Sequence, residues 1–294
     1  GLTSSLFGPA LRLGQALRPL LPASIKKHLP PAAPARAAST AAHRRRVLML
    51  QGCVQPSMMP RIDAAAVRVL DAAGIGTMYA GAAGCCGALR THLGDHEGGL
   101  ADMRRNIDAW SPSVEAGEVE AIVTSATACS LAIKEYGHAL SGDPAYAERA
   151  ARISALASDL SEYLPDLVTA LRDRLRPDAG ERLALHSPCT LQHGQGLRGG
   201  IETHLRTLGF DVRTAAAEDH LCCGSAGTYS VLQPELAQRL RDRKLRHLTE
   251  LEPQCVVSAN MGCIQHLQSG TSTPVKHWIE VLDAVLDLEA TLPA

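Results

Sequence analysis

The sequence predicts an α/β protein built as two tandem, pseudo-symmetric halves, each a small, mostly parallel sheet flanked by helices. Two observations lead to this fold class. Eight of the nine cysteines fall into two sets of four with matching spacing, and the stretches around them alternate between short apolar strands and amphipathic helices. The 294 residues, 46% of them hydrophobic, suffice for two domains of ordinary size.

The cysteine spacing is the clearest sign of an internal duplication. Cys53 and Cys189 are 136 residues apart, Cys85 and Cys222 are 137 apart, and Cys129 and Cys263 are 134 apart. We call Cys53, Cys85, Cys86 and Cys129 the first thiol set, and Cys189, Cys222, Cys223 and Cys263 the second thiol set. Cys255 belongs to neither, and we expect it to act as a small apolar side chain in a buried strand.

Each half is expected to repeat the same order of elements. One strand precedes the first cysteine of each set, a second precedes the Cys-Cys-Gly turn, and a third precedes the last cysteine. The expected strands are Val47–Leu50, Thr77–Ala80 and Ala121–Thr124 in the first half, and Leu183–His186, Asp211–Thr214 and Val256–Ser258 in the second. Because parallel strands end at one edge of a sheet, the four thiols of each half should converge there.

A helix is expected after each Cys-Cys-Gly turn. In the first half its apolar face is Leu100, Met103, Ile107 and Trp110, and in the second half Pro234 opens a helix with a stripe of Leu236, Leu240 and Leu248. The glycines, Gly87 and Gly224, should allow a turn that re-aims the two adjacent thiols.

The remaining regions complete the expected domain organisation. It comprises a basic helical segment with a Pro/Ala linker (1–43), a first cysteine-rich domain (44–142), a helical connector (143–180) and a second cysteine-rich domain (181–294). The connector reads as one long helical region over 143–176, with an apolar face of Ile153, Leu156, Leu160, Leu164, Leu167 and Leu171. The stripe of Val275, Trp278, Ile279, Leu282, Val285 and Leu286 predicts a last core helix, with a subunit contact as the alternative.

The charge is unevenly distributed along the chain. Residues 1–46 hold eight Lys or Arg and no acidic residue, which leaves 21 basic and 30 acidic residues in the remainder. Leu11, Leu13, Leu17, Leu20 and Leu21 predict a docking helix here, followed by the Pro/Ala stretch from Pro30 to Ala42; a transit-like segment is the alternative. The Gly1 start predicts a processed or truncated product.

Composition excludes several functional classes. The high hydrophobic content and the net charge of -1 argue against a disordered chain. An isoelectric point near 6.9 argues against a nucleic-acid partner. No uninterrupted apolar run reaches the roughly 18 residues of a membrane-spanning helix. We found neither a Ser-His-Asp order nor a usefully spaced pair of carboxylates, so no catalytic residue and no substrate-converting site are expected in this chain.

Four converging thiols suit either zinc or an iron–sulfur cluster. Structural zinc sites usually use two short C-x2-4-C knuckles, which this sequence lacks, so the spacing favours iron–sulfur and leaves zinc as the alternative. Disulfides are disfavoured because the cysteine count is odd and adjacent cysteines pair poorly. His186, His193 and His220 lie beside these cysteines, where each could hydrogen-bond a cluster sulfide or cap a loop.

These motifs resemble the "CCG" domain pair of the heterodisulfide-reductase-like iron–sulfur proteins. More closely, RRVLMLQGCVQP, AGCCGAL, NIDAW, KEYG, CTLQH, HLCCGSAGTY, SANMGC and HWIE resemble the glycolate oxidase (glycolate dehydrogenase) iron–sulfur subunit family over nearly the whole chain. The resemblance implies an electron-transfer subunit of an oxidoreductase complex, which receives electrons from FAD-binding subunits and passes them towards quinone. It further implies a cytoplasmic location, with peripheral attachment to the inner face of the cell membrane.

The resemblance also implies [4Fe–4S] clusters, one or two in this chain, bound by the first and second thiol sets. Members of the family normally begin with a ferredoxin-like region bearing two C-x2-C-x2-C-x3-C-P motifs, and we expect that region to have been removed or never encoded here. The heterodisulfide reductase members end each domain with C-x2-C, whereas Ala126 and Asn260 occupy that position here. If one half has lost its cluster, the first is expected to be the one. Related subunits of glycerol-3-phosphate or lactate oxidation remain an alternative, as does a zinc-binding scaffold without redox function.

Overall fold

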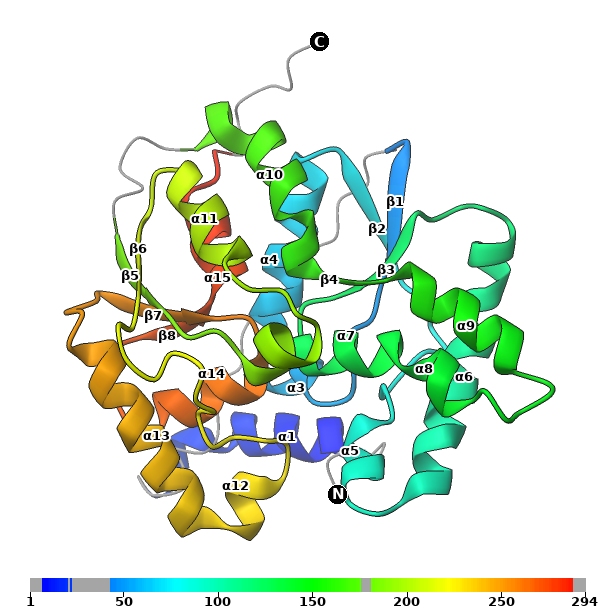
Figure 1. The fold of residues 1–294 in the computed structure, drawn as a ribbon, viewed down its shortest axis with the longest axis horizontal. Coiled ribbons are helices and arrows are strands. Elements are labelled where there is room, and N and C mark those ends of the chain that lie inside the picture. The colour runs from blue at the N-terminus through cyan, green and yellow to red at the C-terminus, as the bar shows by residue number, and fades with distance from the viewer. Residues whose placement is uncertain (1–6, 21, 23–42, 176–180, 288–294) are drawn as a thin grey trace.

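Each half of the chain forms one four-stranded sheet whose strands all run parallel, with helices packed around it (Figure 1). The computed structural model describes residues 7–20, 22, 43–175 and 181–287. The strand orders are β2-β1-β3-β4 and β6-β5-β7-β8, so the two sheets have the same topology. The predicted fold class is therefore confirmed.

The first half begins after a short amino-terminal segment of α1 (Phe7–Ala16) and η1 (Arg18–Leu20). Its elements are β1 (Arg45–Met49), α3 (Gln55–Met58), α4 (Pro60–Ala72), β2 (Ile75–Met78), α5 (Ala88–His92), α6 (His96–Glu115), β3 (Ala121–Thr124), α7 (Thr127–Lys134), α8 (Tyr136–Ala139), α9 (Ala147–Leu156), β4 (Ala157–Asp159), η2 (Leu160–Tyr163), α10 (Leu164–Leu171) and η3 (Arg172–Arg174).

The second half repeats this order with fewer helices at its end. Its elements are β5 (Arg182–Leu185), the π-helical turn η4 (Thr190–Gly194), α11 (Gly200–Thr207), β6 (Asp211–Thr214), α12 (Tyr229–Leu232), α13 (Pro234–Thr249), β7 (Cys255–Ser258), α14 (Met261–Gln268), β8 (Val275–His277) and α15 (Trp278–Val285). Pro60 and Pro234 occupy the first turns of α4 and α13, where a fixed φ and a missing N–H cost the helix nothing.

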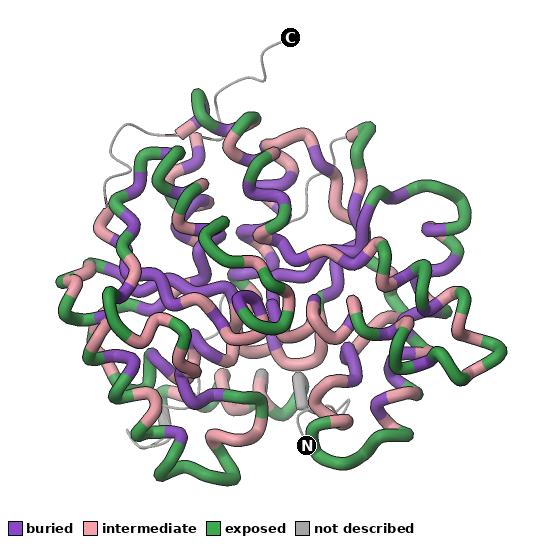
Figure 2. Tube along the Cα trace, in the orientation of Figure 1, coloured by how far each residue is buried: buried purple, intermediate pink, exposed green. Residues whose placement is uncertain are grey.

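Side chains of successive strand residues enter different cores. Val47 and Met49 of β1 join the large core that reaches both halves, whereas Leu48 and Leu50 join a smaller core under α6, α8 and α9. The central strands β1, β3, β5 and β7 are mostly buried, while most helices show exposed turns on their outer side (Figure 2). Burial on both faces explains why these central strands read as apolar runs.

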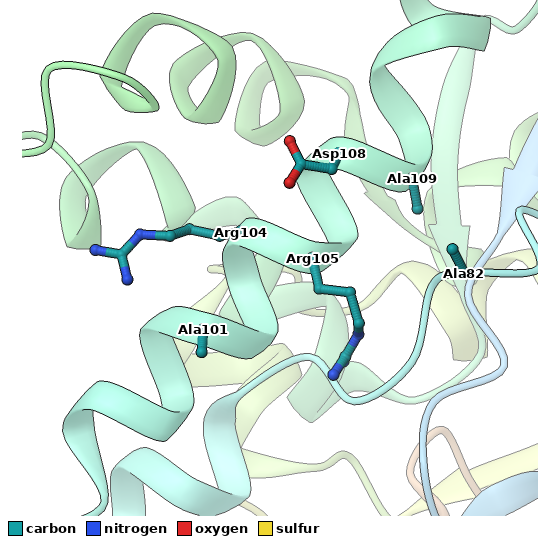
Figure 3. A pocket seen from close by; sticks show the side chains of 6 residues that line it. All are labelled: Ala82, Ala101, Arg104, Arg105, Asp108 and Ala109. Atoms are coloured by element: carbon teal, nitrogen blue, oxygen red, sulfur yellow. The ribbon is translucent and has the colours of Figure 1, made fainter.

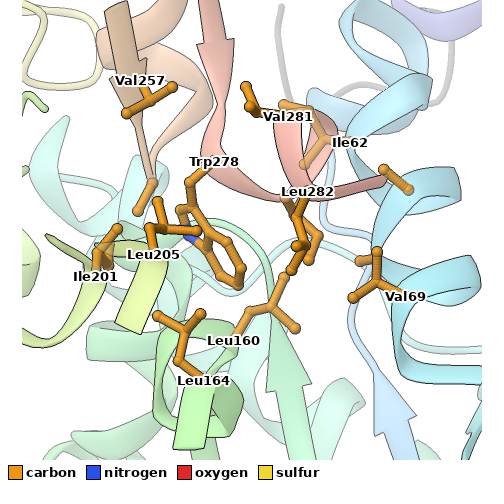
Figure 4. Close-up of a cluster of buried hydrophobic side chains, with 14 of the residues drawn as sticks. Ile62, Val69, Leu160, Leu164, Ile201, Leu205, Val257, Trp278, Val281 and Leu282 are labelled. Carbon is orange, nitrogen blue, oxygen red and sulfur yellow. The ribbon is translucent and has the colours of Figure 1, made fainter. Parts of the chain in front are cut away.

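The large core joins the two halves into one packed unit. Trp278 at the start of α15 is fully buried and lies near Leu160 and Leu164 of the first half and Leu205 of the second (Figure 4). Helices α15 and α4, which belong to different halves, pack directly on one another. The stripe around Trp278 therefore serves the core, although its first member, Val275, lies in strand β8.

Equivalent loops of the two halves also hydrogen-bond to each other. The Thr127 N–H donates to the carbonyl of Ala259 at 3.2 Å. Burial lowers the pKa of His277 to about 4, so its ring is neutral at neutral pH. Its Nδ1 accepts from the backbone N–H of Ile279 at 3.1 Å, which leaves Nε2 to donate to the Ser125 carbonyl at 2.9 Å.

We call the hydrogen bond from His277 to Ser125 the first brace between the halves. A second brace holds a residue of the second half. The Gln195 side chain of the second half donates to Asp159 at 3.2 Å and to the Ser130 hydroxyl at 3.1 Å, both in the first half. Asp159 and His277 are equivalent residues, since each ends the edge strand of its sheet and caps the following helix in a capping box. Each half thus uses the residue at the end of its last strand to bind a loop of the other half.

The single long helical region predicted over 143–176 is wrong. Strand β4 interrupts it and pairs with β3, because Asp159 caps a new helical segment and the chain must extend to reach the sheet. The leucines of the predicted apolar face after this break, from Leu160 to Leu171, are nevertheless buried in the core.

The predicted stripe on α13 is right at Leu248 and wrong at Leu236, while Leu240 is half-buried. Leu236 is 49% exposed, and the buried residues of this helix are Ala237, Lys244, Leu245 and Leu248. On α6 the predicted face is largely right: Met103, Ile107 and Trp110 are buried, and Leu100 is partly buried against the same core.

The predicted amino-terminal helix is present as α1, where Leu13 is exposed and the Gln15 side chain lies 3.4 Å from the Ser57 carbonyl. The Pro/Ala stretch from Pro30 to Ala42 lies outside the described residues. None of the described helices combines the length and hydrophobicity needed to cross a membrane.

Candidate metal centres

The cysteines of each thiol set lie at the carboxyl edge of their sheet. Cys53 follows β1, the pair Cys85 and Cys86 follows β2, and Cys129 lies in the first turn of α7 after β3. The second half repeats this placement after β5, β6 and β7. Strand order reverses between β1 and β3, and between β5 and β7, which is where parallel sheets open a crevice for ligands.

The four thiols of the first set lie in contact with one another as a chain. Cys53 contacts Cys85, Cys85 contacts Cys86, and Cys86 contacts Cys129. Because the neighbouring thiols Cys53 and Cys86 donate hydrogen bonds to it, the pKa of Cys85 falls to about 3, while those of Cys53 and Cys86 rise. The predicted convergence of the first set is confirmed.

The second set forms the same chain, from Cys189 to Cys222, Cys223 and Cys263. Hydrogen bonds from Cys189 and then Cys223 lower the pKa of Cys222 to about 2. The pKa of Cys263 is lowered as well, first by Cys223. In both sets two cysteines are buried and two are partly exposed, so each site reaches from the core to the surface.

Gly87 and Gly224 shape both Cys-Cys-Gly turns in the same way. Each has φ = 90°, a left-handed conformation that glycine adopts at little cost. A Cβ at Gly87 would lie 2.7 Å from the carbonyl oxygen of Gly99 on α6, and one at Gly224 would collide with the carbonyl oxygen of Ala237 on α13. The turn therefore lies directly against the helix, and the Gly224 N–H donates to Cys222 Sγ at 3.3 Å.

Buried polar groups behind the turns hold them in place, and sequence reasoning missed them. Asn106 on α6 donates to the Cys85 carbonyl at 2.8 Å, and the Tyr136 hydroxyl donates to the Cys86 carbonyl at 2.9 Å. In the second half, buried Lys244 donates to the carbonyls of Glu218 and Asp219, just before the turn, at 2.6 and 3.1 Å. The sequence did contain a sign of this burial: Lys244 lies four residues from both Leu240 and Leu248, on the same face of the helix.

The three histidines near the second set differ in their surroundings. His193 contacts the His220 carbonyl at 3.0 Å through Nε2 and Arg198 at 2.8 Å through Nδ1, so it caps a loop. His220 is exposed. His186 is buried, and its ligand nitrogen and the sulfurs of Cys223 and Cys263 all lie within 4.8 Å of one another.

The positions that depart from C-x2-C also differ between the halves. Asn260 caps α14, and its side-chain amide lies 3.6 Å from Cys263 Sγ, within reach of a hydrogen bond to sulfur. Ala126 holds the same place before α7 and offers no polar side chain. Cys255 lies fully buried in β7 and belongs to the large core.

Two arginines line a surface hollow beside the first Cys-Cys-Gly turn (Figure 3). It is lined by Ala82, Ala101, Arg104, Arg105, Asp108 and Ala109. Arg105 donates to the Cys85 carbonyl at 3.1 Å and to Asp102 at 2.6 Å. Its guanidinium group therefore helps to fix the turn.

The donor chemistry of both sets fits a thiophilic metal group. In the part of the chain that the structure describes, the donors at each edge are thiols, and in the second half Cys223 and Cys263 form a close group with the imidazole of His186. Soft thiolate ligands select zinc, copper(I) or iron–sulfur clusters over magnesium or calcium. All nine cysteines are free, which leaves both sets available as ligands.

Comparisons with known proteins point to one family. The family model "Cysteine-rich domain" (CCG) matches residues 47–134 and 183–268. The chain is 45% identical to the glycolate oxidase iron–sulfur subunit of Escherichia coli (strain K12) over 97% of this chain and 69% of that protein. It is 31% identical to the probable glycolate oxidase iron–sulfur subunit of Bacillus subtilis (strain 168), over 88% of this chain and 57% of that protein.

More distant relatives bear a different name. Lactate utilization protein A of Geobacillus thermodenitrificans is 25% identical over 81% of this chain and 98% of that protein.

Proposed function

This chain belongs to the family of glycolate oxidase iron–sulfur subunits, and from that premise we propose that it carries electrons between the subunits of a glycolate-oxidising complex. The electrons would come from FAD-binding subunits and pass towards quinone, at the inner face of the cell membrane. The observation that carries the proposal is the pair of four-thiol sites, built alike and placed at the carboxyl edges of two adjoining sheets.

We assign one iron–sulfur cluster, of the [4Fe–4S] type, to each thiol set. Such a cluster supplies one-electron redox chemistry. Cys53, Cys85, Cys86 and Cys129 would hold the first, and Cys189, Cys222, Cys223 and Cys263 the second. The surrounding backbone supports thiolates rather than thiols, because the Gly224 N–H points at Cys222 Sγ and the last cysteine of each set lies at a helix amino terminus.

The segments that carry the two sites touch across the interface between the halves. Thr127, close to Cys129, shares a 2.7 Å hydrogen bond between hydroxyls with Thr190, the neighbour of Cys189. Helix α7 and the η4 turn pack together around this contact. A rigid contact between two redox sites fixes their separation, which supports a two-step relay.

Iron and acid-labile sulfide per chain test the proposal directly. Anaerobically purified protein is expected to hold about eight irons, from two clusters of four, with matching sulfide and an EPR signal on reduction. Cys129→Ser and Cys263→Ser should each remove about half of the iron, and comparison of the two assigns any half-empty sample to one site. Zinc in place of iron, in protein never exposed to air, would contradict electron transfer and support a scaffold.

An apolar surface next to the second site is suited to a protein partner. Val231 and Leu232 of α12 are 75% and 63% exposed, and they follow the Cys-Cys-Gly turn in the chain. Leu236, at the start of α13, is also exposed. Arg239, Asp242 and Arg243 line a hollow at the same place, with Arg243 ion-paired to Glu218, so the surface combines apolar and charged groups. We propose that the FAD-binding subunits dock here.

Replacing both Val231 and Leu232 by Asp is expected to weaken binding to the FAD-binding subunits about tenfold or more, because central apolar contacts dominate interface energies. Titration of the purified subunits against the immobilised chain measures this. Leu93→Asp is the matched control, since Leu93 is comparably exposed but lies in the first half. Equal binding by the double variant and the parent would contradict the docking site. Co-purification with lactate-oxidising rather than glycolate-oxidising subunits would instead favour the lactate role.

A further inference from the structure

His186 is a buried imidazole whose ring meets sulfur rather than oxygen or nitrogen. It is 1% exposed, neither Nδ1 nor Nε2 has an oxygen or nitrogen partner among the described residues, and the ring lies within hydrogen-bonding reach of the Cys263 thiol. The backbone fixes its position, because its N–H donates to the Val257 carbonyl at 2.8 Å at the end of β5. Its ring and the sulfurs of Cys223 and Cys263 lie within 4.8 Å of one another.

An unpaired imidazole in the core is costly. A buried polar group that gives up its hydrogen bonds to water and gains none in the protein destabilises the fold, and the ring offers two such nitrogens. Two other histidines show the usual solution: both nitrogens of His277 have backbone partners, and His193 contacts the His220 carbonyl and Arg198. His186 therefore stands apart from its neighbours, and the groups nearest to it are metal-ligating sulfurs.

The duplication provides an internal reference for this position. Leu50 at the end of β1 makes the equivalent backbone hydrogen bond, from its N–H to the Val123 carbonyl at 2.9 Å. Leu50 is buried in an apolar core, so leucine satisfies the fold at this place. A histidine at the second copy is not needed for packing, and it makes the two sites chemically different.

We propose that His186 is an iron ligand of the second site, beside Cys223 and Cys263, so that this site is a mixed cysteine–histidine centre and the first is all-cysteine. This inference rests on the proposed function. The second site then offers five donors to four irons, so His186 displaces one thiolate; a neutral imidazole in its place makes the centre less negative and easier to reduce, as histidine does in Rieske clusters. The second site then has the higher potential of the two.

The test compares full-length protein made with natural and with 15N-labelled histidine, reconstituted anaerobically and reduced. ENDOR on the parent is expected to show a strong nitrogen coupling that changes with the isotope. His186→Leu, which copies the first half, should abolish that coupling, whereas His193→Leu should retain it. His186→Cys keeps a ligand at this position, so it should keep its iron, lose the nitrogen coupling and shift the midpoint potential of the second centre to a more negative value.

The failures of the two proposals can be told apart. Clusters present in the parent without nitrogen coupling, coupling that survives His186→Leu, or an unchanged potential in iron-loaded His186→Cys would each overturn the ligand assignment and leave the electron-transfer role standing. Parent protein that binds no iron–sulfur cluster would overturn both.

Discussion

Gly224→Ala is expected to remove most of the iron bound by the second half. The added Cβ would collide with the carbonyl oxygen of Ala237, and φ = 90° is strained for any residue with a side chain. The turn would have to leave α13, which moves Cys222 and Cys223 away from Cys263 and breaks the hydrogen bond from residue 224 to Cys222 Sγ. Iron analysis should show about four irons per chain rather than about eight.

Gly209→Ala is the matched control for Gly224→Ala. Gly209 also has a positive φ, of 96°, but a Cβ there would meet no atom within 4 Å. The control therefore carries the backbone strain without the collision, and its iron content should equal that of the parent. If Gly224→Ala retains full iron and an unchanged EPR spectrum, the close contact between turn and helix is not needed for metal binding.

Trp278→Ala is expected to lower the free energy of unfolding by about 3–5 kcal/mol, the usual cost of removing a large aromatic side chain from a core. Trp278 is fully buried in the core shared by both halves (Figure 4), so the cavity would weaken the whole molecule. Urea unfolding followed by far-UV circular dichroism measures the loss.

Trp110→Ala provides the comparison for Trp278→Ala. Trp110 is equally buried, but it lies in the smaller core of the first half, stacked near Tyr136. A similar decrease in the free energy of unfolding is expected. Because the cavity lies in the first half, the iron of the second half should be retained. A loss below about 1 kcal/mol in Trp278→Ala would show that the shared core can close around the missing ring.

The sequence was sufficient to predict three of the four strands of each sheet, but not the fourth, at one edge. The three strands predicted in each half are present within two residues of their expected bounds. The central ones are apolar runs buried on both faces, and β2 and β6 were found from their place before the Cys-Cys-Gly turns. Strands β4 and β8 were missed, since each has only three residues and carries polar side chains such as Ser158 and Lys276. Short edge strands are defined by the partner strand, which a single sequence does not reveal.

The cysteine positions were sufficient to predict both thiol sets, because the repeat spacing is visible without any structure. The groups behind the turns were not predictable in the same way. Asn106 and Lys244 act on backbone carbonyls far away in the chain, at 2.8 and 2.6 Å, and such contacts leave little pattern in the sequence. His186 was noticed only as a neighbour of Cys189, and its lack of oxygen or nitrogen partners beside the Cys263 thiol became visible only in the structure.

The reciprocal braces between the halves have a consequence for how such a duplication can evolve. Ser125, close to Cys129 in the first half, is held by His277 of the second, and Gln195, close to Cys189 in the second half, is held by Asp159 of the first. Neither copy carries all the contacts that position its own metal-site loops. A gene encoding one half alone would lose these supports, so the two copies can diverge in their ligands but must be inherited together.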